Sequence, residues 1–360
     1  MNPKERVKTI LSFKEADRVP WDLWATPEVI ELLCKKLNLA DKESLLRYFE
    51  VDFRYIVGPS FVGQELKKYD DGSVEDLWGV RRKTITLEKD GIKWSYKHVL
   101  ISPLEKAESV KEIDEYKWPS YDLWDYSELK KECMKYKDFV IVNAGDRLDR
   151  TAQLKPMMYL RGVEQSLIDL YTNPKIAEAI IEHIKNYFLE YNKRVFEEVK
   201  GEVDIFMMGD DFGTQHGLMV SKEMWKKFFK DGFKKYIELA HRYGMKVMHH
   251  TCGSVKELIP EFIDCGLDIL QSLQPRAKDM DLKTLKKEFG KYIAFHGGID
   301  IQQTLPKGTK EDIRKEVEEK MAVGKPGGGF IISTAHNIQP DTPLQNIITL
   351  FEAYKEFGKY

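Results

Sequence analysis

The strongest constraint on the fold is an alternation that starts near residue 139. Short apolar runs rich in β-branched residues are separated there by longer charged segments with an apolar residue every three or four positions. Two similar runs, 19–24 and 51–57, come earlier in the chain. Apolar strands that alternate with helices indicate a parallel sheet covered on both faces, and eight such units in 360 residues favour a closed (β/α)8 TIM barrel. The six later runs are 139–144, 203–208, 246–251, 267–270, 292–295 and 329–333.

The stretch from about residue 60 to 137 does not follow this repeat, and a segment of that length should carry structure of its own. Residues 84–88 and 93–99 alternate around Asp90-Gly91, which is a strong hairpin-turn signal. Residues 103–136 then predict two short helices. We expect a β-hairpin and helical insertion between the second and third strands, within a single domain that covers residues 1–360. It would pack across one end of the barrel as a lid or a dimer contact.

Composition narrows the classes of partner. The chain has 57 basic and 59 acidic residues, so its net charge of -2 offers no overall field to attract nucleic acid or an anionic membrane. No apolar run approaches the roughly 20 residues of a transmembrane helix. The first twenty residues lack the apolar core of a signal peptide, and four cysteines fit a reducing compartment, so we expect a cytoplasmic protein. The cysteines are Cys34, Cys133, Cys252 and Cys265.

Polar residues gather where the predicted strands end, which is the edge at which barrels of this kind carry their active sites. Arg147 and Arg150 follow the third strand, and either could bind a substrate carboxylate or phosphate or form a structural ion pair. Asp210 and Asp211 follow the fourth strand. They could act as a general acid or base, ligate a metal, or cap the next helix, and only one should face the cavity because neighbours in an extended chain alternate.

His250 and Cys252 lie two positions apart at the end of the fifth strand, so both side chains point to one face while His249 points to the other. An imidazole and a thiolate together suit zinc, which in catalytic sites commonly has three protein ligands and one open position. His336, after the eighth strand, is the best candidate for the third ligand. The alternative is a packed strand end with a satisfied histidine. The next candidates for the third ligand are Asp210, Asp211 and His296.

These motifs resemble the uroporphyrinogen decarboxylase superfamily, which also contains cobalamin-dependent methyltransferases. The resemblance runs along most of the chain and implies the same (β/α)8 fold. It is carried by residues 209–215, Trp225 and residues 250–253, 297–300 and 336–343.

The resemblance is closer to the zinc-containing methyltransferase branch than to the true decarboxylases. Residues 19–27 lack the arginines with which the decarboxylases bind porphyrinogen carboxylates. His250 and Cys252 match the first two zinc ligands of the methyltransferases. His336 stands where those enzymes have a later cysteine and matches a histidine of the decarboxylases instead. The implied metal ligands are His250, Cys252 and His336.

The reaction implied by the resemblance is transfer of a methyl group between a corrinoid, methylcobalamin on a partner protein, and a small thiol or methoxy substrate. Zinc would be the cofactor, Asp210 would orient the substrate or the fourth metal ligand, and Arg147 would contact an anionic group. Family members often pair as homodimers. Two alternatives stay open: a metal-free decarboxylase of a small carboxylated substrate, and a barrel that only binds a ligand.

Overall fold

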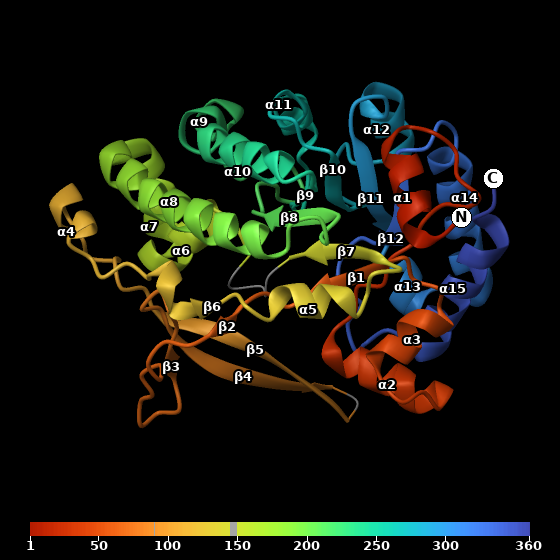
Figure 1. Cartoon of the computed structure of the whole chain (residues 1–360), viewed down its shortest axis with the longest axis horizontal. Helices are drawn as coiled ribbons and strands as arrows, with labels where there is room; N and C mark the ends of the chain where they lie inside the picture. The colour runs from red at the N-terminus through yellow and green to blue at the C-terminus, as the bar shows by residue number, and fades with distance from the viewer. Residues whose placement is uncertain (90, 145–149) are drawn as a thin grey trace.

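The computed structural model describes residues 1–89, 91–144 and 150–360, and its centre is a curled parallel β-sheet (Figure 1). Seven strands form this sheet in the described residues, in the order β1-β7-β8-β9-β10-β11-β12. Each overlaps a run predicted as a strand, so the parallel α/β fold is confirmed. The strands are β1 (Phe53–Ile56), β7 (Val140–Asn143), β8 (Ile205–Gly209), β9 (Lys246–His250), β10 (Ile269–Leu273), β11 (Ala294–Ile299) and β12 (Phe330–Thr334).

The sheet is buried on both faces, as its uninterrupted apolar strands predict. Met207 and Met248 belong to one buried cluster, to which all seven strands contribute a side chain. Their neighbours Met208 and Val247 belong to a second, larger cluster that also includes the apolar faces of the helices. A cluster that joins one face of every strand requires the sheet to curve around it, and this curvature brings the carboxyl ends of the strands together.

The first predicted strand, residues 19–24, lies beside β12 without forming a ladder. Trp21 makes an isolated parallel bridge to Ile332, whose N–H donates to the carbonyl of Pro20 at 3.1 Å. On the other side, the N–H of Asp52 donates to the carbonyl of Trp21 at 3.2 Å. Pro20 has no N–H, and the N–H of Trp21 donates to the Asp52 carboxylate at 3.0 Å. Two backbone N–H groups of a regular strand ladder are therefore missing at Pro20 and Trp21. The segment is still hydrogen-bonded to β12 on one side and to Asp52 on the other.

Helices cover the outer side of the sheet, with α8 to α12 along one side and α14 and α15 at the other end of the view in Figure 1. Within the described residues, no helix has both the length and the apolar character needed to cross a membrane. The helices are α1 (Pro3–Leu11), α2 (Pro27–Leu37), α3 (Lys42–Tyr48), α6 (Leu154–Arg161), α7 (Val163–Thr172), α8 (Pro174–Glu198), α9 (Lys222–Phe228), α10 (Lys230–Arg242), α11 (Ile259–Asp264), α12 (Leu282–Phe289), α13 (Thr304–Lys307), α14 (Lys310–Gly324) and α15 (Leu344–Phe357).

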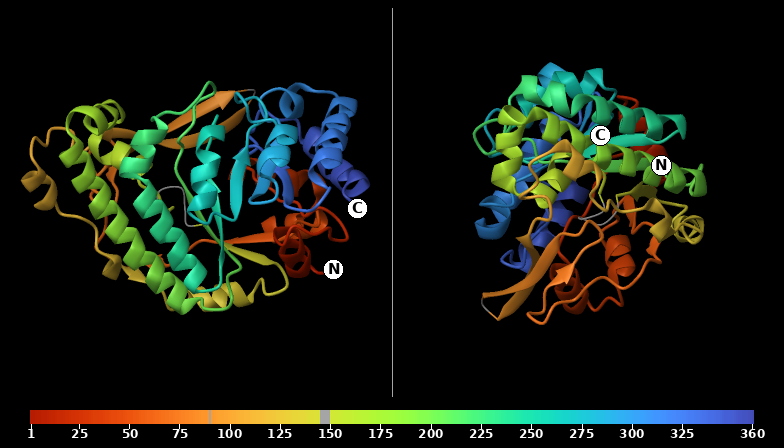
Figure 2. Two further views of the ribbon diagram at one scale, coloured as in Figure 1. Left: turned by 90° about the horizontal axis from the view of Figure 1, so that it is seen from above. Right: turned by 90° about the vertical axis from the view of Figure 1, so that its left-hand side faces the viewer.

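The chain between β1 and β7 forms two small antiparallel sheets and short helices. β4 (Arg81–Lys89) pairs with β5 (Ile92–Ile101), as the alternation on either side of Asp90-Gly91 predicts. In both views of Figure 2 this ribbon stands at the edge of the molecule. In the described residues of this stretch, the remaining elements are β2 (Ser60–Phe61), β3 (Val74–Glu75), α4 (Val110–Asp114), the 3-10 helix η1 (Tyr121–Leu123), β6 (Trp124–Asp125) and α5 (Leu129–Met134).

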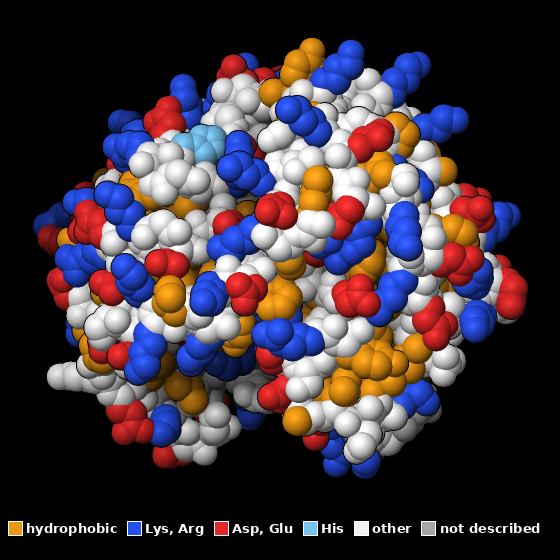
Figure 3. Space-filling view, turned by 45° about the vertical axis from the view of Figure 1, so that its right-hand side comes forward, with side chains coloured by type: hydrophobic (Ala, Val, Ile, Leu, Met, Phe, Trp, Pro, Cys, Tyr) orange, Lys and Arg blue, Asp and Glu red, His pale blue; other side chains and the backbone are white. Residues whose placement is uncertain are grey.

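Charges of both signs are interspersed on the face of the molecule shown in Figure 3. Lysine and arginine side chains there alternate with aspartate and glutamate, and no broad area of one sign is visible on that face. This pattern agrees with the small net charge of the sequence.

Candidate metal centre

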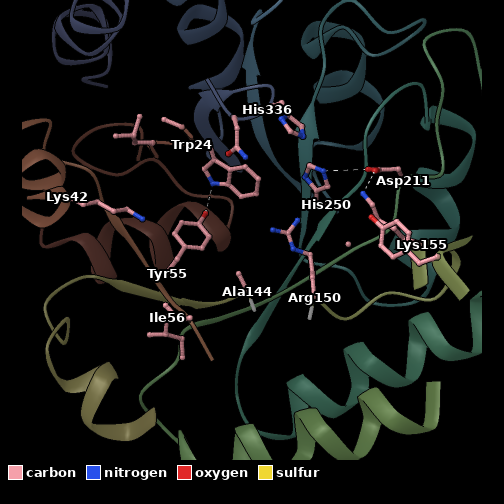
Figure 4. A pocket seen from close by; sticks show the side chains of 16 residues that line it. Trp24, Lys42, Tyr55, Ile56, Ala144, Arg150, Lys155, Asp211, His250 and His336 are labelled. Atoms are coloured by element: carbon pink, nitrogen blue, oxygen red, sulfur yellow. Dashed lines mark hydrogen bonds and ion pairs between the residues drawn. The ribbon is translucent and has the colours of Figure 1, made fainter. Parts of the chain in front are cut away.

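A pocket of about 510 Å³ opens at the carboxyl ends of β1, β8 and β9. Its walls come from distant parts of the chain and include Trp24, Tyr55, Asp211, His250 and His336. Figure 4 shows Trp24 and Tyr55 together on one side of it, with the His250 and His336 rings beside them and Asp211 beyond His250. The pocket therefore lies at the edge of the sheet where the polar strand ends meet.

Three residues with metal-binding side chains lie together beside this pocket. One ligand atom from each of His250, Cys252 and His336 lies within 4.8 Å of the others. The Sγ atom of Cys252 is 3.5 Å from Nε2 of His250. At the usual bond lengths of zinc, tetrahedral nitrogen and sulfur ligands are about 3.6 Å apart. The donor set thus fits a tetrahedral cation and leaves a fourth position for another ligand.

The His250 ring is oriented for binding through Nε2. Its Nδ1–H donates to the side-chain carbonyl of Gln271 on β10, which leaves the Nε2 lone pair toward Cys252. Burial, reinforced by the positive charge of Arg150, holds the pKa of His250 well below its usual value. The imidazole is therefore neutral, which is the form that binds a metal.

His249 lies on the opposite face of β9, as the alternation of a strand predicts. Its ring packs among Phe212, Phe233 and Phe262, with ring centroids 4.8 to 5.9 Å apart. Burial lowers the pKa of His249 to about 3. This histidine is a neutral part of the core.

Of the two neighbouring carboxylates, Asp211 lines the pocket and Asp210 does not. Its Oδ1 accepts the backbone N–H of Cys252 at 3.1 Å and lies 3.6 Å from Nε2 of His250, while Oδ2 accepts from Nζ of Lys155 at 2.8 Å. Burial opposes ionisation of Asp211, but the positive charge of Lys155 and the hydrogen bonds from Lys155 and the Cys252 backbone outweigh it and lower the pKa of Asp211. Burial and the charge of Asp211 raise the pKa of Cys252 to about 12, so without a cation the thiol keeps its proton.

Asp210 caps a helix, as one of the sequence alternatives predicts. The helix is α6, which precedes Asp210 in the chain, and not the helix that follows it. Its two carboxylate oxygens accept the backbone N–H groups of Gln153, Leu154 and Lys155 at 2.6, 2.9 and 2.7 Å. Burial raises the pKa of Asp210 to about 6, against the effect of these three donors. Because Asp210 holds the start of α6, it fixes the helix from which Lys155 reaches Asp211.

The sequence predicts three further residues at this site, Arg147, Arg150 and His296. Arg147 lies outside the described residues. Arg150 lines the pocket, and its guanidinium carbon is 5.8 Å from the centre of the Trp24 ring. His296 is fully buried, and its Nε2 lies 3.1 Å from the Asp22 carboxylate and away from the three clustered ligands.

Sequence reasoning missed Gln271, Lys155 and Trp24. Gln271 lies inside an apolar strand, which is an unusual place for an amide and could have suggested a bond to a strand neighbour. The contacts of Lys155 and Trp24 depend on how α6 and residues 20–25 pack on the sheet, and no local pattern reports that packing.

Gly213 allows the Cys252 backbone to pack closely against the loop that follows β8. A Cβ atom on Gly213 would lie 2.6 Å from the carbonyl oxygen of Cys252, because the loops that follow β8 and β9 cross at this point. We expect Gly213→Ala to displace Cys252, to lower the free energy of unfolding by about 1–3 kcal/mol and to weaken zinc binding. Urea denaturation and zinc titration measure the two effects. Gly217→Ala in the same loop is the control, since nothing lies within 4 Å of its Cβ position; equal behaviour of the two variants would contradict the crossing-point explanation.

Comparison with protein families gives one match over more than half of the chain. The family model described as uroporphyrinogen decarboxylase (URO-D) matches residues 152–357. These residues include Asp210, Asp211 and all three clustered ligands.

Two kinds of characterised protein are similar in sequence. The methylcobamide:CoM methyltransferase MtaA of Methanosarcina barkeri is 24% identical over 159 residues, which are 44% of this chain and 43% of that protein. Uroporphyrinogen decarboxylase of Legionella pneumophila (strain Corby) is 24% identical over 201 residues, 52% of this chain and 50% of that protein. The matched region thus spans about half the length of these relatives.

Among solved structures, a methyltransferase from Methanosarcina mazei is similar to this chain, with a TM-score of 0.66 and 18% sequence identity. The alignment covers 99% of this chain and 99% of that protein. At this identity the likeness concerns the fold. It extends over the elements between β1 and β7 as well as over the parallel sheet.

Proposed function

The chain belongs to the uroporphyrinogen decarboxylase family, and on that premise we propose that it is a zinc-dependent methyltransferase. It moves a methyl group between a corrinoid on a partner protein and a small thiol or methoxy substrate. The observation that carries the proposal is the meeting of His250, Cys252 and His336 at the pocket, with ligand atoms within 4.8 Å of one another. The similarity to a methylcobamide-dependent methyltransferase supports the choice of reaction.

His250, Cys252 and His336 would hold the zinc ion. The ion would supply Lewis acidity, which lowers the pKa of a thiol acceptor or polarises the oxygen of a methoxy donor. His336 in the third position gives the ion a second neutral ligand, and a set with a single thiolate leaves it more Lewis-acidic than one with two.

The chain's own residues prepare the pocket for this chemistry. Among the described residues, Asp211 places a negative charge beside the ligand atoms, with its Oδ1 3.6 Å from Nε2 of His250, so this oxygen is in place to accept the proton of a thiol substrate. Lys155 holds that carboxylate in position. Asp210, proposed from the sequence as a catalytic group, acts through α6 as a positioning residue. We also propose that Arg147 contacts an anionic part of the substrate.

The corrinoid protein would dock over the mouth of the pocket, because its cobalt atom must come close to the substrate. We also infer that residues 1–360 form one (β/α)8 barrel domain. Residues 19–24 would take the place of its first strand, and residues 60–137 would be the insertion between the second and third strands. The bridge of Trp21 to Ile332 and the hydrogen bond from Asp52 to Trp21 support closure of the barrel.

Methyl transfer can be followed through the visible spectrum of the corrinoid. Zinc-loaded protein mixed with methylcobalamin and a panel of small thiols is expected to convert the methylcobalamin spectrum to that of the demethylated corrinoid with at least one thiol. Asp211→Asn removes the proton acceptor and is expected to slow the conversion by roughly 100-fold. The reverse direction is followed with cob(I)alamin and a panel of methoxy donors. If methylcobalamin stays unchanged with every thiol and cob(I)alamin stays unchanged with every methoxy donor, the proposal is contradicted.

The alternative function is a metal-free decarboxylase of a small carboxylated substrate. Arg150 and Lys155 on the pocket wall favour it, since both could bind a carboxylate. His336 or Asp210 would stabilise charge as carbon dioxide leaves, although the engagement of Asp210 by three backbone N–H groups counts against that residue. This enzyme would work unchanged in the presence of a strong chelator.

A further inference from the structure

A second group of polar side chains forms one side of the pocket and continues into the core, and none of its members is among the three clustered ligands. It consists of Asp22, Trp24, Tyr55 and His296, and we call it the Asp22 cluster. Asp22 is 3% exposed, Trp24 8% and His296 0%. The members come from residues 20–25, β1 and β11, so the cluster joins three separate parts of the chain.

The Asp22 carboxylate is the centre of the cluster. Its Oδ2 accepts from Nε1 of Trp24 at 3.0 Å, from Nε2 of His296 at 3.1 Å and from the Tyr55 hydroxyl. Its Oδ1 accepts the backbone N–H of Leu23 at 2.8 Å. A buried carboxylate with four donors has its acceptor positions in use, so its orientation is fixed.

The same bonds fix the plane of the Trp24 indole. Nε1 of Trp24 donates to the Tyr55 hydroxyl at 2.9 Å in addition to Asp22, and the Tyr55 ring meets the indole edge-on at 5.9 Å. Rotation of the indole would break both hydrogen bonds and leave the Asp22 carboxylate short of a donor.

The fixed indole lies flat against the metal ligand His250. The two ring centroids are 5.8 Å apart and the planes differ by only 13°. His250 is thereby held at two places, through Nδ1 by Gln271 and over one ring face by Trp24. The plane of an imidazole decides where its Nε2 lone pair points, so the indole helps to aim that lone pair at the metal position.

We propose that Asp22 and Trp24 are positioning residues for the metal centre: Asp22 locks the indole, and the indole locks the plane of His250. Tyr55 and His296 supply the further donors that hold Asp22. The inference rests on the proposed metal site, and it does not depend on which reaction the site performs.

The test compares zinc affinities, measured by competition with a chromophoric chelator. Trp24→Phe keeps a ring but loses the indole N–H, and Asp22→Asn replaces the acceptor by an amide. Both are expected to bind zinc roughly 10- to 100-fold more weakly than the unaltered chain. Trp124→Phe is the matched control, because Nε1 of Trp124 donates to the Tyr187 hydroxyl at 2.9 Å away from the pocket lining. It should bind zinc within twofold of the unaltered chain.

A second readout is the nuclear magnetic resonance signal of the Trp24 indole N–H. In protein with ¹⁵N-labelled tryptophan, the indole resonance absent from Trp24→Phe belongs to Trp24, one of seven tryptophans. It is expected to shift in Asp22→Asn without metal, and to shift in the unaltered chain when zinc is added. Should Asp22→Asn fail to fold, Tyr55→Phe removes one donor and is expected to weaken zinc binding in the same direction.

The outcomes separate this inference from the proposed function. If the unaltered chain binds zinc and both variants bind it equally well, the positioning role is wrong and the metal site stands. If the unaltered chain binds no zinc, the proposed function fails and the positioning role fails with it.

Discussion

Replacing Cys252 by alanine is expected to weaken zinc binding by roughly 100- to 1000-fold. Structural zinc sites with four ligands bind with about 10–16 kcal/mol, so each ligand contributes about 2.5–4 kcal/mol. Cys252 supplies the thiol of the proposed set, and its Sγ lies 3.5 Å from Nε2 of His250. Isothermal titration calorimetry of the metal-free protein with zinc gives the affinity. Elemental analysis of the purified protein gives the number of zinc ions per chain.

The control for this variant is Cys34→Ala, because Cys34 lies on α2 and is not among the clustered ligands. It should keep about one zinc ion per chain, with unchanged affinity. Zinc binding that persists in Cys252→Ala at the original strength would show that the ion lies elsewhere.

The largest expected effect on stability comes from Asp52. Its fully buried carboxylate accepts from Nη1 of Arg6 at 2.6 Å, from Nη1 of Arg18 at 2.8 Å and from the N–H of Trp21 at 3.0 Å. Removing one partner of a buried ion pair leaves charge without compensation. We expect Asp52→Ala to lower the free energy of unfolding by roughly 3–5 kcal/mol in urea denaturation.

An exposed ion pair serves as the control for Asp52. Glu50 lies two residues away and pairs with Lys355 at 2.7 Å, with about half of each side chain exposed. Glu50→Ala should cost at most about 1 kcal/mol. A cost for Asp52→Ala as small as that for Glu50→Ala would mean that the buried pairs of Asp52 with Arg6 and Arg18 add little to the stability of the fold.

The strands were predictable because burial on both faces leaves long apolar runs in the sequence. Seven of the eight predicted strands are present, and the exception is instructive. Residues 19–24 have the right composition, but Pro20 lacks a donor and the N–H of Trp21 bonds to a side chain. Periodicity reports which residues are buried and does not report where each backbone N–H donates.

The candidate ligands could be predicted from the spacing of His250 and Cys252 and from the rule that active sites lie at strand ends. The choice between Asp210 and Asp211 could not, because it depends on the approach of α6, whose first N–H groups bind Asp210. The Asp22 cluster was likewise hidden, since its members are separated by 33 and 274 residues along the chain.

The most direct measurement of the central claim is the X-ray absorption spectrum at the zinc edge, recorded on protein loaded with one equivalent of zinc. The claim predicts a single sulfur ligand at about 2.3 Å and nitrogen or oxygen ligands at about 2.0–2.1 Å. The sulfur ligand should vanish in Cys252→Ala, and imidazole scattering should decrease in His336→Ala. A spectrum with only oxygen or nitrogen ligands, or one left unchanged by both substitutions, would contradict a zinc centre built from His250, Cys252 and His336.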